Sequence, residues 1–287
     1  MTEPTLLAES GFLRLRIDLA YDGTNFSGWG KQPDRRTVQE EVEKTLQKLT
    51  RTKVETVVAG RTDAGVHATG QVIHTDIPEM ESGPYAKKVN WDFKDLPYRL
   101  NRILDQDVRI LSATVAPYGF HARFSALRRH YSYKILDNNK IILPLKRFDI
   151  APWYRILDVD VLNEASALLL GENDFAAFCK FRESSTTVRN LEKFHWTRND
   201  EGCLVANVVA DAFCYSMVRN LVGAVVCVAD GRFEPQWVKD VLNNRVRISD
   251  SLVFPSRGLT LTQVDYPDDD ELVARIERTL RRRGEDE

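Results

Sequence analysis

The chain has 287 residues, of which 43% are hydrophobic and 29% charged, and its formal net charge is -2. This balance is typical of a soluble globular protein with one large domain or two smaller ones, and it excludes binding of nucleic acid through bulk positive charge. The longest apolar run is too short to span a bilayer, and the N-terminus lacks the pattern of a signal peptide. We therefore expect a cytoplasmic protein with no membrane partner.

In the first half, apolar and charged residues alternate over 13–19, which predicts a half-buried strand. A turn-rich loop follows at 21–34. Thr37 and Glu40 form a capping-box pattern ahead of a helix whose apolar face repeats every three to four residues. Further elements are expected as strands at 54–60, 70–76 and 108–115 and a helix at 97–104. The polar stretch 81–95 is expected to be a loop or insertion.

The second half repeats the same order. Strands are expected at 130–136, 191–197, 203–211 and 259–266, and helices at 158–170, 214–231 and from Pro235 onward. Asp158 and Gly171 are the start and stop signals of the first of these helices. The second helix should turn Met217, Leu221 and Val225 inward, together with Val228.

Each half therefore has the order strand, helix, strand, strand, helix, strand, which is the split βαβ or ferredoxin-like order. The predicted fold class is α+β, with two ferredoxin-like domains sharing an extended antiparallel sheet with a central cleft. We expect an N-terminal domain at 12–117 that carries the catalytic Asp, a C-terminal domain at 118–267 and a charged tail at 268–287. The tail is at most a short amphipathic helix with a solvated arginine face.

The four cysteines are Cys179, Cys203, Cys214 and Cys227. They form no C-x-x-C pair, so the sequence indicates neither a zinc site nor a redox pair. Four cysteines in a chain of this length are typical of reduced, mostly buried thiols in a cytosolic protein.

The stretch AGRTDAGVH, at 59–67, connects two predicted strands and carries one guanidinium, Arg61, and one carboxylate, Asp63. Asp and Gly are common in turns, so Asp63 can simply bond nearby backbone amides. The alternative is chemical. Glycines let a ligand approach the backbone closely, and an ionised carboxylate needs no activation to act as a nucleophile.

Arg219 lies in an apolar helix, where an arginine either extends its head group to solvent or needs a partner such as a buried carboxylate. Asp63 is a candidate partner. Arg61 has two interpretations, a surface ion pair or a contact to a phosphate or base. Tyr131 and Tyr133 are two apart on a strand and share a face, which suits core packing or stacking on a base.

Between His121 and Lys134 the chain carries cations and no acid. Such a strip can bind phosphate even in a mildly acidic protein. The candidate phosphate contacts are Arg123, Arg128, Arg129 and Lys134.

No metal site is expected, because His67 and His74, with Asp63 and Asp76, match no ligand spacing. The sequence also has no Walker loop, no G-x-G-x-x-G after a strand and no G-x-S-x-G. We therefore expect no cofactor.

Six blocks of the sequence closely resemble, in the right order, those of the TruA-type tRNA pseudouridine synthases. They are YDGTNFSGW, AGRTDAGVHATGQVIH, HARFSALRRHYSY, LLGENDFAAF, DAFCYSMVRNLVG and RGLTLTQVDYP. Together they extend over roughly 12–267. Gly30, where the family often has glutamine, and Tyr215 and Ser216, where many members have two histidines, depart from the pattern and concern details of RNA contact.

The resemblance implies two ferredoxin-like domains, a homodimer, and conversion of uridine to pseudouridine at positions 38, 39 and 40 in the tRNA anticodon stem-loop, without a cofactor. Asp63 matches the family's catalytic aspartate, and Arg219 matches the arginine that pairs with it. Tyr131 matches the tyrosine that stacks on the target uracil, and Tyr133 is the second aromatic of that strand. Arg61 matches a residue that helps to hold the target nucleotide out of the stack. The sequence leaves open whether Asp63 attacks the sugar or abstracts a proton from it.

Three other functions are considered. A non-catalytic RNA-binding protein of the same fold would leave uridine unaltered. A metal-dependent hydrolase would use His67, His74 and Asp76 and would be sensitive to chelators. A related synthase would act at other RNA sites, which the ordered blocks argue against.

Overall fold

The computed structural model describes residues 8, 11–78, 93–180, 186–245 and 253–284. The chain divides into unit 1, made of residues 1–64, 68–127 and 264–287, and unit 2, made of 65–67 and 128–263. Both units combine helices with strands, so the fold is α+β, as the sequence predicts. Within the described part of the chain, no helix is long and apolar enough to cross a membrane.

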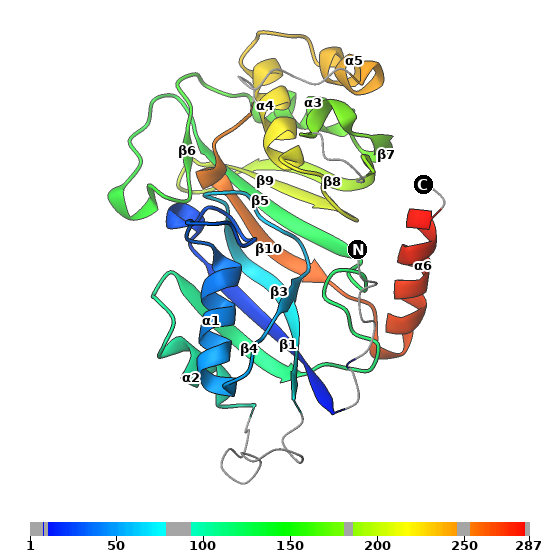
Figure 1. Ribbon diagram of the computed structural model, residues 1–287. Coiled ribbons are helices and arrows are strands. Elements are labelled where there is room, and N and C mark those ends of the chain that lie inside the picture. Colours follow the sequence, from blue (N-terminus) through cyan, green and yellow to red (C-terminus); the bar gives the residue numbers. More distant parts are fainter. Residues whose placement is uncertain (1–7, 9–10, 79–92, 181–185, 246–252, 285–287) are drawn as a thin grey trace. The chain divides into compact units, whose positions relative to one another are not determined.

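The sheet of unit 1 has the order β4-β1-β3, with β2 on the other side of β3, and all these pairs are antiparallel. Its strands are β1 (Phe12–Tyr21), β2 (Thr56–Val58), β3 (His67–Pro78) and β4 (Val108–Val115). Its helices are α1 (Val38–Thr50), α2 (Leu96–Asn101) and, near the end of the chain, α6 (Leu272–Gly284). Helix α1 lies across one face of the strands (Figure 1).

The alternation in β1 is confirmed, because Leu15, Ile17 and Leu19 are buried. Strand β2 is shorter than expected, whereas β3 begins earlier than expected. Its register with β1 runs from Phe12 opposite Pro78 to Tyr21 opposite Ala68, so the long β1 provides partners for the whole of β3. The stretch 81–95 lies outside the described residues, apart from the turn at 93–95.

Helix α1 begins where the sequence predicts, but the expected capping box is wrong. Thr37 is the N-cap residue, yet its side chain makes no capping hydrogen bond, and Glu40 pairs with Lys44. The first amides of the helix are satisfied by carbonyl groups of the preceding loop instead. The Val38 N–H donates to Gly28 O at 3.3 Å, and the Gln39 N–H donates to Trp29 O at 3.0 Å. These two hydrogen bonds therefore attach the loop to the N-terminus of α1.

The sheet of unit 2 has the order β10-β5-β9-β8-β7, and the short β6 pairs with β5. Its strands are β5 (Arg128–Leu136), β6 (Ala151–Pro152), β7 (Gly171–Asp174), β8 (Val188–Arg198), β9 (Leu204–Ala210) and β10 (Leu259–Asp265), which passes into unit 1 after Gln263. Its helices are α3 (Val159–Ala167), α4 (Met217–Ala229) and α5 (Gln236–Asn244). Helices α3 and α4 lie side by side (Figure 1).

The helix signals of the second half are confirmed in part. Asp158 caps α3 by accepting from the N–H groups of Asp160 and Val161, although the helix ends at Ala167, before Leu170. The four residues expected on the inner face of α4 are all buried, namely Met217, Leu221, Val225 and Val228.

The C-terminal segment contains an amphipathic helix, as expected, and this helix packs on unit 1. Leu272 and Ile276 are buried, and the Thr279 hydroxyl donates to Phe124 O at 3.0 Å.

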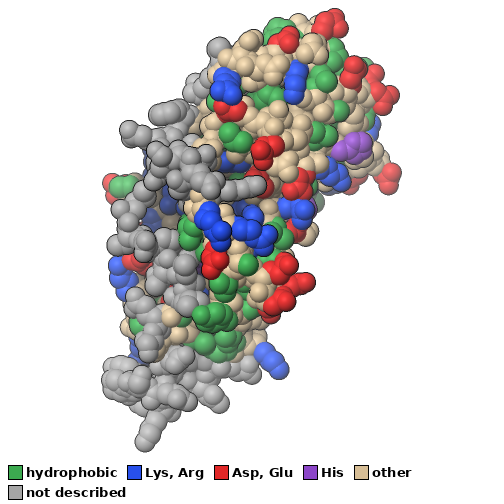
Figure 2. All heavy atoms as spheres, turned by 90° about the vertical axis from the view of Figure 1, so that its right-hand side faces the viewer, with side chains coloured by type: hydrophobic (Ala, Val, Ile, Leu, Met, Phe, Trp, Pro, Cys, Tyr) green, Lys and Arg blue, Asp and Glu red, His purple; other side chains and the backbone are tan. Residues whose placement is uncertain are grey.

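Basic and acidic side chains lie close together on the side of the molecule drawn in Figure 2. Mixed charge of this kind is typical of a solvated surface.

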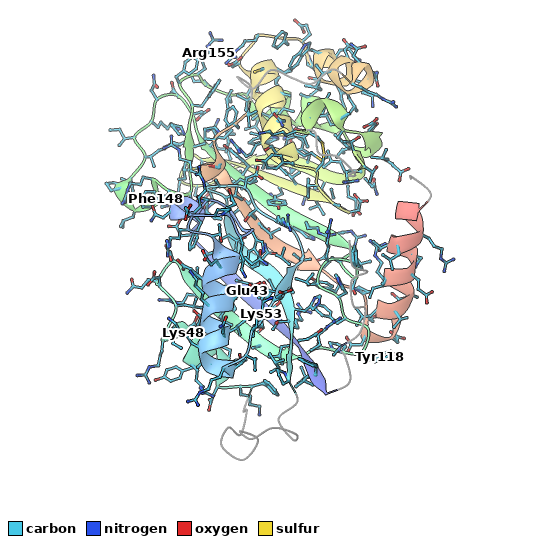
Figure 3. The ribbon with its side chains drawn as sticks, viewed as in Figure 1. Glu43, Lys48, Lys53, Tyr118, Phe148 and Arg155 are labelled. Atoms are coloured by element: carbon cyan, nitrogen blue, oxygen red, sulfur yellow. A yellow bond between two sulfur atoms is a disulfide. The ribbon has the colours of Figure 1, made fainter. Side chains whose placement is uncertain are left out.

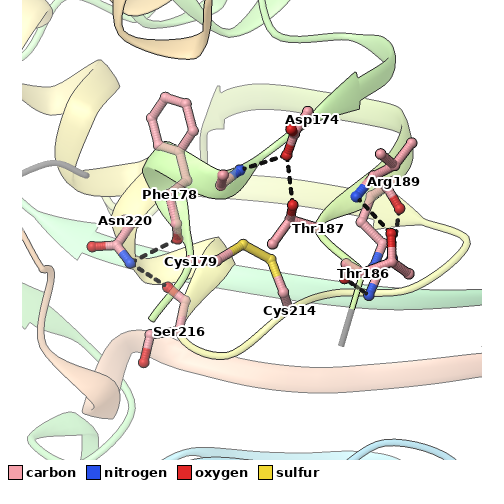
Figure 4. Close-up of a disulfide and its surroundings, with 11 residues drawn as sticks. Asp174, Phe178, Cys179, Thr186, Thr187, Arg189, Cys214, Ser216 and Asn220 are labelled. Atoms are coloured by element: carbon pink, nitrogen blue, oxygen red, sulfur yellow. Dashed lines mark hydrogen bonds between the residues drawn. A yellow bond between two sulfur atoms is a disulfide. The ribbon is translucent and has the colours of Figure 1, made fainter. Parts of the chain in front are cut away.

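The expectation of four free thiols is wrong. Cys179 and Cys214 form a disulfide, with their Cα atoms 5.7 Å apart, while Cys203 and Cys227 are free and buried. Figure 4 shows the bond beside Asn220, which donates to Phe178 O at 2.8 Å and to Ser216 O at 3.1 Å. The two cysteines are 35 residues apart in the sequence, so only the fold brings them within bonding distance.

Alkylation tests the disulfide directly. In the unfolded, non-reduced protein we expect only Cys203 and Cys227 to react, as measured by mass spectrometry. Because the bond joins residues 35 apart, its reduction should lower the free energy of unfolding by about 4 kcal/mol. Urea denaturation with and without reductant measures this change. Four reactive thiols before reduction would contradict the assignment.

Candidate functional site

The loop 59–66, called the Asp63 loop below, joins β2 to β3 and carries the candidate catalytic residue, and its residues 59–64 belong to unit 1. Arg61 is exposed, Thr62 is buried and Asp63 is half-buried. Asp63 therefore keeps part of its surface exposed, although its loop is attached to the core. This exposure suits a carboxylate that reacts with a bound substrate.

The loop at 21–34, which contains the YDGTNFSGWG segment and is called the glycine-rich loop below, packs directly on the Asp63 loop. Gly28 has φ +93°, and a Cβ atom built on it would lie 2.8 Å from Thr62 O and 3.2 Å from Asp63 C. The Trp29 N–H donates to the same Thr62 carbonyl at 3.1 Å. Glycine at position 28 thus permits both the left-handed backbone and the close approach. Arg61 lies beside Gly30, its guanidinium carbon 4.0 Å from where a Cβ atom would be.

Helix α1 supports the same region through Glu43, which is labelled in Figure 3. This buried carboxylate accepts from both the N–H and the hydroxyl of Thr56, each at 2.8 Å, and it pairs with Lys31. The start of β2 and the end of the glycine-rich loop are therefore fixed to one helix. The start of β2 and this loop both adjoin the Asp63 loop. The Asp63 loop is therefore supported by regular secondary structure.

In unit 2, Tyr131 and Tyr133 share one face of β5, as predicted. Tyr131 is 8% exposed and meets the ring of Phe213 edge to face, with ring centroids 5.1 Å apart. Tyr133 is fully buried, and its hydroxyl donates to Pro255 O at 2.5 Å. Burial raises the pKa of Tyr133 far above its usual range. A direct contact of Tyr133 with substrate stays a prediction, and its burial favours an indirect one.

Arg219 is half-buried on α4 and is held by the segment before β10. Its Nε donates to Phe254 O at 2.6 Å, and the Phe254 N–H donates back to Arg219 O at 3.2 Å. The first bond orients the guanidinium, and the second joins the backbone of α4 to that segment. Asp63 belongs to unit 1 and Arg219 to unit 2, so their pairing stays a prediction.

The four candidate phosphate contacts lie in different environments. Arg123 is exposed, with its guanidinium 5.6 Å from the centre of the Phe124 ring. Arg128 pairs with Glu192 at 2.5 Å, and Lys134 pairs with Asp149 at 2.7 Å. Arg129 is buried and donates to Asp211 O. Contact of any of the four with an RNA phosphate stays a prediction.

Two buried histidines shape the turn that presents Arg123. His74 Nδ1 accepts from the Ala122 N–H at 3.0 Å, and His121 Nδ1 accepts from the N–H groups of Arg123 and Phe124 at 3.2 and 3.1 Å. Burial, reinforced by the nearby charge of Arg14, lowers the pKa of His74 to about 2 and that of His121 to about 4. Both rings are neutral at physiological pH, which leaves Nδ1 free to accept.

The side chains considered for a metal site have protein partners. His67 Nε2 lies 2.7 Å from Phe148 O, and His74 Nδ1 accepts from the Ala122 N–H. Asp76 forms a bidentate salt bridge with Arg14, with both N–O distances 2.8 Å. In the part of the chain that is described, no three His, Cys, Asp or Glu side chains are grouped as metal ligands are.

Three residues near the site were missed by the sequence analysis: Tyr21, Gln71 and Glu43. All are buried within unit 1 and hydrogen-bonded to the Asp63 loop or to the strands beside it. A buried polar residue in a strand has no periodic signal of its own. Only the position of Gln71 just after the GRTDAGVHATG segment hinted at a link with the loop.

The chain matches the profile of the tRNA pseudouridine synthase family over residues 19–125 and 165–267. It is 51% identical over 271 residues to the tRNA pseudouridine synthase A of Frankia casuarinae, covering 94% of this chain and 95% of the relative. It is 50% identical to that of Streptomyces griseus, covering 93% of each chain. For Mycobacterium leprae the identity is 45%, over 98% of this chain and 99% of the relative. This chain therefore belongs to the tRNA pseudouridine synthase family.

The two neutral histidines predict how stability depends on pH. Their folded pKa values lie below the 6.5 of an exposed histidine, so below that pH the unfolded chain binds more protons than the folded one. The free energy of unfolding should therefore decrease as the pH falls from 6.5 toward 4, by about 1.4 kcal/mol per unit for each histidine.

Urea denaturation over this pH range measures the slope. The control is His121→Asn, because its amide oxygen can accept the same backbone N–H groups without titrating. It should show a shallower slope than the wild type. Equal slopes would mean that His121 is not held neutral by the fold.

Proposed function

We propose that this protein is the isomerase that converts uridine to pseudouridine at positions 38, 39 and 40 in the anticodon stem-loop of tRNAs. The observation that carries the proposal is Asp63, a half-buried aspartate on a loop held by hydrogen bonds from the core of unit 1. Its match to the family's catalytic aspartate supports the same assignment. A purely RNA-binding role is not favoured, because an acid at an RNA-binding site would repel phosphate.

The proposed chemistry breaks the bond between C1′ of the ribose and N1 of uracil, and the base turns and rejoins C1′ through C5. The hydrogen on C5 is lost to solvent as a proton and N1 gains a proton, so the product is an isomer of the substrate. The target base must first leave the stack, which costs a few kcal/mol. Tyr131 would stack on it, offsetting about 1–3 kcal/mol of that cost, and Arg61 would help to hold the nucleotide out. Asp63 would attack the sugar or remove a proton from it, and Arg219 would favour the ionised form of Asp63.

We also propose that each unit is ferredoxin-like. Support comes from within each unit: β1, α1, β2, β3, α2 and β4 follow the split βαβ order with the strand order β4-β1-β3, and β5, α3, β8, β9, α4 and β10 follow it with β10-β5-β9-β8. We further propose that the protein is a cytoplasmic homodimer, as the family resemblance implies. No cofactor is assigned to the reaction.

The first test is tritium release from C5-labelled uridine in a whole tRNA transcript, with EDTA present. Asp63→Asn keeps the size of the side chain but removes the anionic carboxylate, so release should fall at least about 10⁴-fold, while tRNA binding remains. The matched control is Asp200→Asn, in the exposed turn between β8 and β9, which should retain full activity. Equal release from wild type and Asp63→Asn would refute the catalytic assignment.

Phosphate contact by Arg123 predicts a change in salt dependence. Arg123→Gln should weaken binding to all tRNAs alike and reduce the slope of log affinity against log salt by about 1. Lys48→Gln is the control, since this exposed side chain on α1 (Figure 3) is not a candidate contact. Filter binding at several salt concentrations measures both. The same slope in wild type and Arg123→Gln would exclude the contact.

A further inference from the structure

Three polar side chains are buried beneath the Asp63 loop in unit 1. Tyr21 at the end of β1 is 5% exposed, Gln71 in β3 is fully buried, and Thr62 in the loop itself is 6% exposed. The Tyr21 hydroxyl lies 2.8 Å from Thr62 Oγ1, and Gln71 Nε2 donates to the Tyr21 hydroxyl oxygen at 3.1 Å. The second Nε2 hydrogen of Gln71 is donated to Gly60 O at 2.8 Å.

The donors and acceptors of this network can be assigned from the number of hydrogens that each side chain carries. Gln71 uses both amide hydrogens, one on Tyr21 and one on Gly60, and its Oε1 accepts from the Val72 N–H at 3.2 Å. Because the Tyr21 oxygen already accepts from Gln71, its own proton is best used on Thr62. Burial raises the pKa of Tyr21 to about 12, so this proton stays in place at physiological pH.

Such a network is costly to bury, because an apolar side chain of similar volume needs no partner at Gln71 or Tyr21. The residues that this network contacts indicate its role. Its two ends hold residues 60 and 62, the positions on either side of Arg61. With alternate residues held inward, Arg61 is exposed and Asp63 is half-buried. The Trp29 N–H holds the Thr62 carbonyl as well, so residue 62 is fixed by its side chain and by its backbone.

We propose that Tyr21, Thr62 and Gln71 are positioning residues that set the place of the Asp63 carboxylate for catalysis. This inference rests on the proposed function. None of the three touches the reacting atoms; they act through the backbone of residues 60–62. A neighbouring contact that orients a reactive group is typically worth 10- to 100-fold in activity, and we expect a loss of about that size when the network is cut.

The decisive comparison is between two identical substitutions in the same unit. Thr62→Val removes the hydroxyl that meets Tyr21. Thr75→Val removes another buried threonine hydroxyl, in β3, which donates at 2.8 Å to the carbonyl of Glu55, before β2 and at the opposite end of that strand from the Asp63 loop. Both variants lose one buried hydrogen bond of the same length, so a general loss of stability should affect them alike.

Single-turnover pseudouridine formation and tRNA affinity are measured for both variants, with urea denaturation for stability. We expect Thr62→Val to lower the rate about 10- to 100-fold with unchanged tRNA affinity, and Thr75→Val to keep the wild-type rate. Thr62→Ser, which keeps the hydroxyl, should restore most of the rate. Tyr21→Phe should lower it as Thr62→Val does, and the double variant should be no slower than either one.

The outcomes separate this inference from the proposed function. An inactive wild-type protein would refute the function itself. An active wild type with equal rates for Thr62→Val and Thr75→Val would overturn the positioning role alone. Additive losses in Tyr21→Phe and Thr62→Val would also overturn it, because one network predicts coupled effects. Should Thr62→Val fail to fold, Tyr21→Phe against Thr75→Val gives the same comparison.

Discussion

The hydrogen bonds that hold Gly60 and Thr62 from inside unit 1 are the constraint on which the proposed chemistry depends. A loop with glycines at 60 and 65 has little stiffness of its own. Here its carbonyl groups are held from β3 by Gln71 and from the glycine-rich loop by Trp29. That second loop is in turn attached to the first amides of α1. The position of one carboxylate therefore follows from a continuous set of contacts that ends in two strands and a helix.

Unit 2 holds its candidate residues by different means. Tyr131 is packed against Phe213, and Arg219 is fixed by two bonds to the backbone of Phe254. The helix that carries Arg219 is buried along most of its length, and the disulfide of Cys214 lies just before its start. Aromatic packing and a largely buried helix therefore support these two side chains. The two units thus present a carboxylate and a guanidinium from separately stiffened supports.

The sequence predicts the order of elements well, because alternation in β1 and the apolar face of α4 are local patterns that packing reinforces. It fails where a distant group takes over a local role. The Thr37 capping box is replaced by hydrogen bonds that the first N–H groups of α1 donate to loop carbonyls, and Cys179 meets Cys214 only through the fold. Asp63 was found through its family motif. Tyr21 begins another family block, but its hydrogen-bonding role has no local signal because its partners come from two other segments.

Unit 1 is assembled from the first and last parts of the chain, whereas unit 2 is nearly continuous. On the ribosome, every residue of unit 2 is therefore made before α6, whose Leu272 and Ile276 complete the apolar contacts of unit 1. The hydrogen bond from Thr279 to Phe124 O joins residues that are more than half the chain apart. The turn at Phe124 therefore lacks this bond until α6 has been synthesised. The half of the molecule that carries Asp63 begins to be synthesised first and can be completed only last, so it stays open longest to proteases and chaperones.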